Sequence, residues 1–101
     1  MMSNQDENLV CYKMLSVWTA DTLPEAFKNR HNTKSGTWAK LQILSGDLTM
    51  EFMLGDGTVT NRIKYSTLQQ PPLIKPKQYH RIAAYSNDIR CQLSFYAKED
   101  S

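Results

Sequence analysis

The chain has 101 residues, with 12 lysines and arginines against 10 acidic residues and a formal net charge of +2. The basic residues form no run or stripe, so we expect no nucleic-acid partner. The polar first residues, MMSNQDEN, lack the pattern of a secretory signal, and no apolar run approaches the length that spans a membrane. We therefore expect a cytoplasmic protein with no membrane partner, folded as a single domain over residues 1–101 with an ordered core at about 9–98.

The first third of the chain predicts short extended runs and one helical turn. Residues 9–17, LVCYKMLSV, are apolar with isolated polar positions, which is typical of a strand at the edge of a core. The pair Pro24-Glu25 predicts the first turn of a very short helix, because proline is tolerated where the amide has no intrahelical partner. An extended chain from Phe27 onward places Phe27 and His31 on one face, so we expect His31 to point into the core.

The middle of the chain predicts a pair of alternating strands. Residues 37–44 place Trp38 on one face and a set of apolar side chains on the other, namely Ala39, Leu41 and Ile43. A tight turn at Gly46 follows, and the alternation resumes over residues 48–54. This pattern predicts that the two runs pair with each other as a β-hairpin.

The last part of the chain predicts three more elements. The run Gly55-Asp56-Gly57 indicates a second tight turn before a strand over residues 59–65, and the prolines at 71 and 72 interrupt any sheet ladder. Further on, His80, Ile82 and Ala84 share one face, so we expect His80 to point inward. A final strand over 89–96 completes seven or eight short strands, which predicts an antiparallel sandwich or barrel.

Two cysteines, Cys11 and Cys91, lie far apart, each in an apolar run and in no C-x-x-C arrangement. In a cytoplasmic chain we expect two buried free thiols rather than a disulfide or a reactive site.

The two histidines of the chain, His31 and His80, both fall on inward faces. Imidazole can act as an acid or base, anchor an anionic ligand or coordinate a divalent transition metal; a histidine that only packs in the core is the alternative. A metal site usually takes at least three protein ligands. No H-x-H or similar spacing supplies a third one, and the nearest carboxylates, Glu25, Glu51 and Asp88, are expected at the surface. The sequence predicts no catalytic residue and no definite cofactor, with a metal at the two histidines left open.

Aromatic and basic residues flank the two histidines. Trp38 and Tyr79 are candidate walls of a ligand pocket, as is Trp18, although each can instead fill the core. Three basic residues near the histidines, Arg30, Lys34 and Arg81, would favour an anionic ligand, but strand parity points Arg30 and Arg81 away from the inward face.

Two longer runs carry a resemblance to a known family, and these are WTADTLPEAFKNRHNTKSGTWAKLQILSGDL and KPKQYHRIAAYSNDIRCQLSFY. They resemble the TehB/YeaR-like family, and within it the amino-terminal domain of tellurite-resistance proteins, over about residues 9–98. The resemblance implies a small cupin-like jelly roll. In longer family members this domain precedes an S-adenosylmethionine-dependent methyltransferase domain that modifies tellurium or selenium compounds, and we expect this chain to be without it.

The resemblance also invites comparison with the metal-binding motifs of cupins. Gly46 matches the glycine that closes the first motif, and His80 takes the place of the histidine in the second. The glutamate position of the first motif falls at Ala39, and the H-x-H positions fall near residues 32–35, which contain no histidine.

From these observations we expect a cupin-like binding module associated with tellurite resistance and oxyanion stress, without catalysis of its own. Its partners would be a small molecule or oxyanion, a second copy of the chain and a separate methyltransferase. The alternatives are a metal-dependent cupin enzyme that acts on a small molecule, and a structural or dimerising domain that covers its sheet edges with a second copy.

Overall fold

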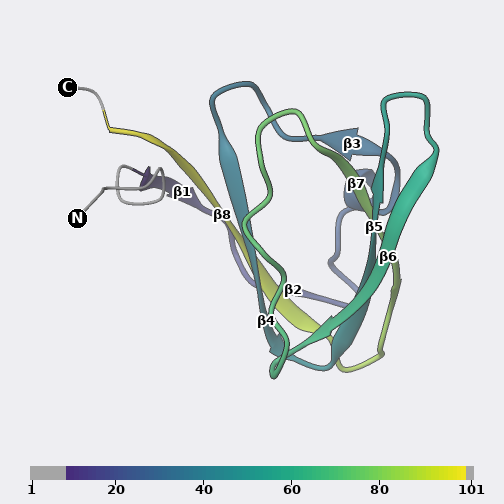
Figure 1. The fold of residues 1–101 in the computed structure, drawn as a ribbon. Helices are drawn as coiled ribbons and strands as arrows, with labels where there is room; N and C mark the ends of the chain where they lie inside the picture. The colour runs from purple at the N-terminus through teal and green to yellow at the C-terminus, as the bar shows by residue number, and fades with distance from the viewer. Residues whose placement is uncertain (1–8, 100–101) are drawn as a thin grey trace.

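The structure, a computed structural model, describes residues 9–99 and shows two antiparallel four-stranded sheets that face each other (Figure 1). In chain order the elements are β1 (Leu9–Met14), β2 (Trp18–Thr19), the 3₁₀ helix η2 (Glu25–Lys28), β3 (His31–Asn32), β4 (Trp38–Ser45), β5 (Asp47–Met53), β6 (Val59–Ser66), β7 (Tyr79–Tyr85) and β8 (Arg90–Lys98). The prediction of an antiparallel all-β fold is confirmed. The two sheets form an open pair of layers and not a closed barrel.

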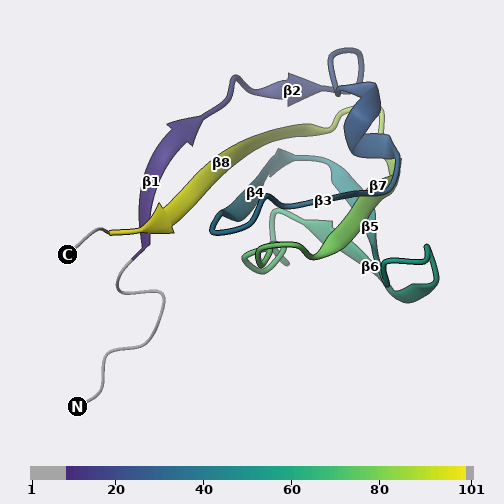
Figure 2. The same cartoon turned by 90° about the horizontal axis from the view of Figure 1, so that it is seen from above.

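Strand β8 organises the first sheet. It pairs antiparallel with β4, β1 and β2, with β1 near its carboxyl end and β2 near its amino end. Figure 2 shows β1 and β2 along one edge of β8 and β4 along the other. The second sheet has the order β3-β7-β5-β6.

The core lies between the two sheets and follows strand alternation. From the first sheet, β4 and β8 contribute buried side chains at alternate positions, namely Ala39, Leu41, Ile43, Cys91 and Leu93. The second sheet contributes Leu48, Met50, Phe52, Tyr65, His80 and Ile82. Because the side chains of a strand alternate between its two faces, one apolar set per strand suffices to build a core between two sheets.

The predicted hairpin of residues 37–44 and 48–54 is wrong. Strand β4 pairs with β8 in one sheet, whereas β5 pairs with β6 and β7 in the other, so the turn at Gly46 carries the chain from one layer to the opposite one. Gly46 has φ +73°. A Cβ at this position would touch Ser86 Oγ and lie 2.7 Å from Asp88 Oδ1 and 2.9 Å from Ile89 Cα.

Hydrogen bonds tie this corner to the connection between β7 and β8, which also crosses between the sheets. Ser45 Oγ donates to the carbonyl of Asp88 at 2.8 Å, and the amide of Asp47 donates to Ser86 Oγ at 3.0 Å. The amide of Ser86 donates in return to the carbonyl of Asp47 at 2.9 Å. The two crossings therefore brace each other at one end of the molecule, seen at the bottom of Figure 1.

Of three further predictions of local structure, the structure confirms one, the turn at residues 55–57, and contradicts two. The turn at residues 55–57 does join the paired strands β5 and β6. Phe27 lies in η2 and not in an extended run, because the turn that begins after Pro24 continues to Lys28. Ala84 is exposed and not inward, since an irregularity in the pairing of β5 with β7 changes the parity of β7 before Tyr85.

The two cysteines are free, as expected, but only Cys91 is buried; Cys11 is exposed. Cys11 lies on β1, whose side chains after Leu9 are all exposed, so the apolar run there does not belong to the core. Among residues 9–99, no helix is long and apolar enough to cross a membrane.

Candidate functional site

A cavity of about 330 Å³ lies between the two sheets and opens to solvent. Its wall is mostly apolar and comes from both sheets and from η2, with Trp18, Ala26, Phe27, Ala39, Leu41, Met50, Ile74, Ile82, Leu93 and Phe95. Its polar residues come from β3, the segment that follows it and β7: His31, Asn32, Thr33, Lys34 and His80. A concave, mainly apolar site with a few grouped polar residues is the usual form of a small-molecule site.

Strand pairing brings the two histidines together. His31 of β3 is the register partner of His80 of β7, and their imidazole centroids lie 4.1 Å apart with the ring planes at 68°. Phe27 packs edge-on against His31, with 4.8 Å between ring centroids. Both imidazoles line the cavity, so the expectation that the two histidines point inward agrees with their positions in the structure.

The backbone fixes the tautomer of both rings. Nδ1 of His31 lies 2.8 Å from the carbonyl oxygen of Asn29, and Nδ1 of His80 lies 2.8 Å from that of Gln78. Because a carbonyl oxygen can only accept, each Nδ1 must carry the proton and donate. In the neutral rings each Nε2 is therefore a hydrogen-bond acceptor.

Two polar atoms of the cavity wall are buried without a partner in the described part of the chain. They are Nε2 of His31 and Oγ1 of Thr33. Buried polar groups are paired in the great majority of cases, and an unpaired one costs free energy. Neither atom is exposed to the cavity, so within residues 9–99 both carry this cost inside the fold.

His80 is held in its neutral form. Its side chain is almost fully buried, and burial together with the positive charge that His31 can carry lowers the pKa of His80 from 6.5 to about 4, although the carbonyl of Gln78 acts in the opposite direction. Near neutral pH, His80 thus presents a lone pair and not a charge to the cavity.

The structure separates the other predicted wall residues from the histidines. Trp38 and Tyr79 do not line the cavity, which corrects the expectation that they form its walls. Strand alternation gives the reason, because the next residues along their strands, Ala39 and His80, are the ones that face inward. Trp18, the remaining candidate wall, does line the cavity.

Thr33 is a lining residue that the sequence pattern does not single out. It lies two residues after His31 and thus has the same parity, but it follows the end of β3, where no strand is predicted. The apolar contributions of Met50 and Ile74 were not predictable from local pattern alone, because nothing in the sequence shows which core residues border an open space.

Of the three flanking basic residues, Lys34 lines the cavity and the two arginines do not. Arg30 donates to the carbonyl of Gly55 and lies over the ring of Tyr79, with its Cζ 5.1 Å from the ring centroid. Arg81 projects from the opposite face of β7 and binds Glu51. The parity prediction for the two arginines agrees with these contacts.

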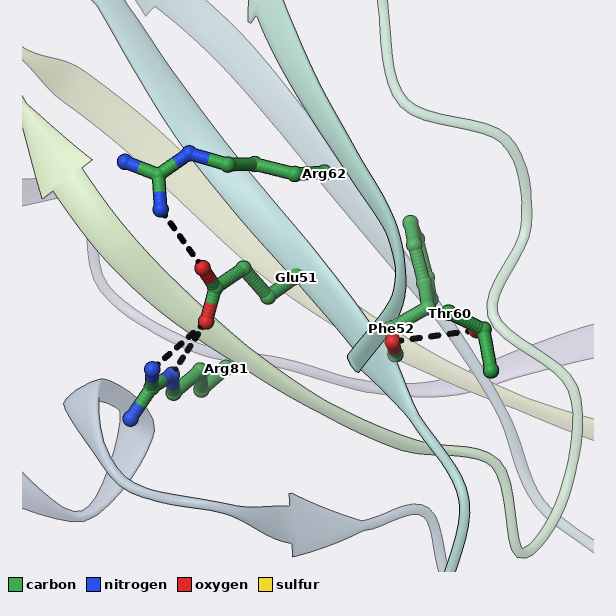
Figure 3. Close-up of polar contacts among 5 residues, drawn as sticks. All are labelled: Glu51, Phe52, Thr60, Arg62 and Arg81. Carbon is green, nitrogen blue, oxygen red and sulfur yellow. Dashed lines mark hydrogen bonds and ion pairs between the residues drawn. The ribbon is translucent and has the colours of Figure 1, made fainter. Parts of the chain in front are cut away.

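Glu51 corrects another expectation, because it is only 4% exposed and not a surface carboxylate. Figure 3 shows it between Arg62 and Arg81, which project from the strands on either side of β5. Arg81 donates from Nε at 2.7 Å and lies within 2.6 Å through Nη2, while Arg62 donates from Nη1 at 2.7 Å. These contacts lower the pKa of Glu51, the bond from Arg81 most of all, against the opposing effect of burial. The cluster holds β6, β5 and β7 together.

A metal does not fit the donors at the cavity. Two histidines line it, and within residues 9–99 no group of three or more histidine, cysteine, aspartate or glutamate side chains is placed to hold a metal ion. Structural and catalytic sites normally use three or four protein ligands. We therefore derive no chemistry through a metal at His31 and His80.

Comparison with known proteins places this fold in a family. The family described as the TehB-like domain matches residues 13–93. This chain belongs to the TehB-like family. Its sequence is 40% identical over 92 residues to the probable S-adenosyl-L-methionine-dependent methyltransferase TehB of Haemophilus influenzae strain Rd, and 39% identical to TehB of strain 10810.

Solved structures show the same fold. The crystal structure of TehB from Haemophilus influenzae matches with a TM-score of 0.88 over 92% of this TehB-like chain and 32% of TehB. An Escherichia coli K12 protein matches with a TM-score of 0.82 at 18% identity, over 98% of this chain and 100% of the other. The chain spans about a third of the length of the curated TehB relatives, 32% in each case.

Proposed function

We propose that this chain is a cupin-like small-molecule binding domain that serves in tellurite resistance and related oxyanion stress, and that it binds its ligand without catalysing a reaction. Membership of the TehB-like family supports the association with tellurite. The observation that carries the binding function is the open, mainly apolar cavity, whose wall includes the neutral imidazole of His80.

The two facing antiparallel sheets with a cavity between them support the cupin-like jelly-roll assignment. The relatives are named as probable methyltransferases, and this chain matches about a third of each. We propose that a methyltransferase is its working partner and that the domain holds a small molecule that the methyltransferase uses or releases.

Growth of cells on tellurite tests this function. The host strain without the gene would be complemented with the wild type, with His31→Asn combined with His80→Asn, or with Tyr79→Phe. Asparagine can keep the donor to the backbone carbonyl while it removes Nε2 from the cavity. We expect the double variant to lose protection and Tyr79→Phe to retain it. Equal protection by all three proteins, at equal protein levels, would contradict a role for the cavity.

A second candidate function, dimerisation, is favoured by strand β1. Within residues 9–99 it pairs only with β8, and three of its apolar residues are 49–62% exposed: Val10, Tyr12 and Met14. An unpaired strand edge with apolar side chains is a template for a second copy. We propose a homodimer across β1. Sedimentation should show a dimer that Val10→Lys with Met14→Lys converts to a monomer, and a monomeric wild type would overturn this proposal.

A further inference from the structure

The charges around the cavity restrict its ligand. Among the described residues that line it, Lys34 is the one permanently charged side chain, and it belongs to an exposed position. The nearby guanidinium groups are engaged elsewhere, that of Arg30 at the carbonyl of Gly55 and that of Arg81 at Glu51. Burial of an anion against an apolar wall without such donors costs several kcal/mol or more.

The hydrogen-bonding polarity of the cavity restricts the ligand further. Nδ1 of His80 donates to the carbonyl of Gln78 and the lowered pKa keeps this ring neutral, so its Nε2 offers a lone pair. A deprotonated oxyanion also offers lone pairs, so the two would repel each other. A ligand with an O–H or N–H group can instead donate to Nε2 of His80.

Thr33 belongs to the polar end of the cavity, but its hydroxyl oxygen is buried and out of reach of a ligand, so the polar contact falls to His80. The other lining residues are mostly apolar, with Trp18 and Phe95 among them, and suit the apolar part of a ligand.

We infer that the ligand of this cavity is an uncharged molecule with an apolar body and an O–H or N–H donor that binds Nε2 of His80, and not a free oxyanion. This inference rests on the proposed function as a small-molecule binding domain. Chemically, such a ligand corresponds to a protonated methyl acceptor, because methylation of its O–H or N–H group would remove the donor.

Three probes that share one aromatic ring test the hydrogen-bond donor and the charge of the ligand separately. Phenol carries a donor, anisole has the same oxygen without its proton, and benzoate carries a negative charge. Their dissociation constants would be measured by calorimetry at pH 7 for the wild type, for His31→Asn and His80→Asn, and for Tyr79→Phe as the control outside the cavity. Circular dichroism would verify the fold of each variant.

We expect phenol to bind the wild type about tenfold more tightly than anisole, which is the effect of one net hydrogen bond. Benzoate should bind more weakly than either. The advantage of phenol should disappear in the histidine variant that removes its acceptor and persist in Tyr79→Phe.

The outcomes distinguish the inference from the function on which it rests. Equal binding of phenol and anisole would overturn the donor requirement but leave a binding cavity in place. Tighter binding of benzoate than of phenol would overturn the uncharged ligand and favour the oxyanion. No binding of any probe at millimolar concentration would contradict both the inference and the proposed binding function.

Discussion

His31 and His80 are register partners on adjacent strands, and their imidazole centroids lie 4.1 Å apart in the wall of the cavity. At this distance, the charge of one protonated ring disfavours protonation of the other. Since Nδ1 of His80 donates to the carbonyl of Gln78 and the pKa of this ring is lowered, its Nε2 is a hydrogen-bond acceptor. This relationship underlies both the proposed function and the ligand class.

The neutral state of His80 makes the stability of the protein depend on pH. His80 has an ordinary pKa of 6.5 and a pKa of about 4 in the fold, so between these values the unfolded chain binds more protons than the folded one. The free energy of unfolding should fall as the pH drops from about 6.5 to about 4, by about 3 kcal/mol at most. Urea denaturation at a series of pH values measures this change. In His80→Asn the curve should be flatter over that range, and identical slopes for both proteins would contradict the assignment.

The Glu51 cluster should contribute to stability at neutral pH. Glu51→Gln keeps the shape of the side chain but removes the charge that binds Arg62 and Arg81, and we expect a loss of about 1–3 kcal/mol in urea denaturation at pH 7. Because the pKa of Glu51 is lowered in the fold, its contribution is present above about pH 4.5 and is lost as the pH falls through the folded pKa. Arg81→Gln should cost more than Arg62→Gln, since Arg81 makes two contacts to the carboxylate. The reverse order would contradict this geometry.

Gly46 lies at the corner between the sheets, and Gly36 offers a matched control outside it. Both have positive φ, +73° and +76°, but a Cβ at Gly36 meets nothing within 4 Å whereas one at Gly46 meets the turn between β7 and β8. Gly36→Ala should cost about 1 kcal/mol from backbone conformation alone. Gly46→Ala should cost about 1–3 kcal/mol more, because the clash adds to the same backbone strain. Equal losses in urea denaturation would show that the corner tolerates a methyl group.

The two thiols should differ in reactivity. Cys11 is exposed, whereas Cys91 is fully buried, and burial raises the pKa of Cys91 to about 11. A thiol reagent such as Ellman's reagent at pH 8 should modify one thiol of the native protein rapidly and the second only after unfolding. Cys11→Ser should abolish the fast reaction. Fast reaction of both thiols in the native state would contradict the burial of Cys91.

Alternation along single strands was enough to predict much of this fold. It indicated the inward positions of Ala39, Leu41 and His80 because side-chain direction in a strand is a local property. It failed at Gly46, since two alternating runs joined by a tight turn look the same whether they pair or cross between layers. The pairing of β4 with β8 and the bonds from Ser86 are contacts over long sequence separations, and no local pattern encodes them.

The sequence also predicted only part of the candidate site. Parity indicated both histidines, but whether they would meet depended on the pairing of β3 with β7. Trp38 and Tyr79 were proposed as walls for their size and their nearness in sequence, although parity already placed Trp38 on the other face. The burial of Glu51 depends on two arginines of neighbouring strands, which become its partners only after the sheet forms.

At pH 7 the imidazole of His80 should be a neutral Nδ1–H tautomer whose Nε2 accepts a hydrogen bond. Long-range ¹H–¹⁵N correlation spectra of the histidine rings at pH 7 test it most directly, because the ¹⁵N shifts separate a protonated ring nitrogen from one with a free lone pair. We predict a protonated Nδ1 and a lone-pair Nε2 in His80, and a shift of its Nε2 signal when phenol is added. A protonated Nε2 in His80 at pH 7 would contradict this assignment.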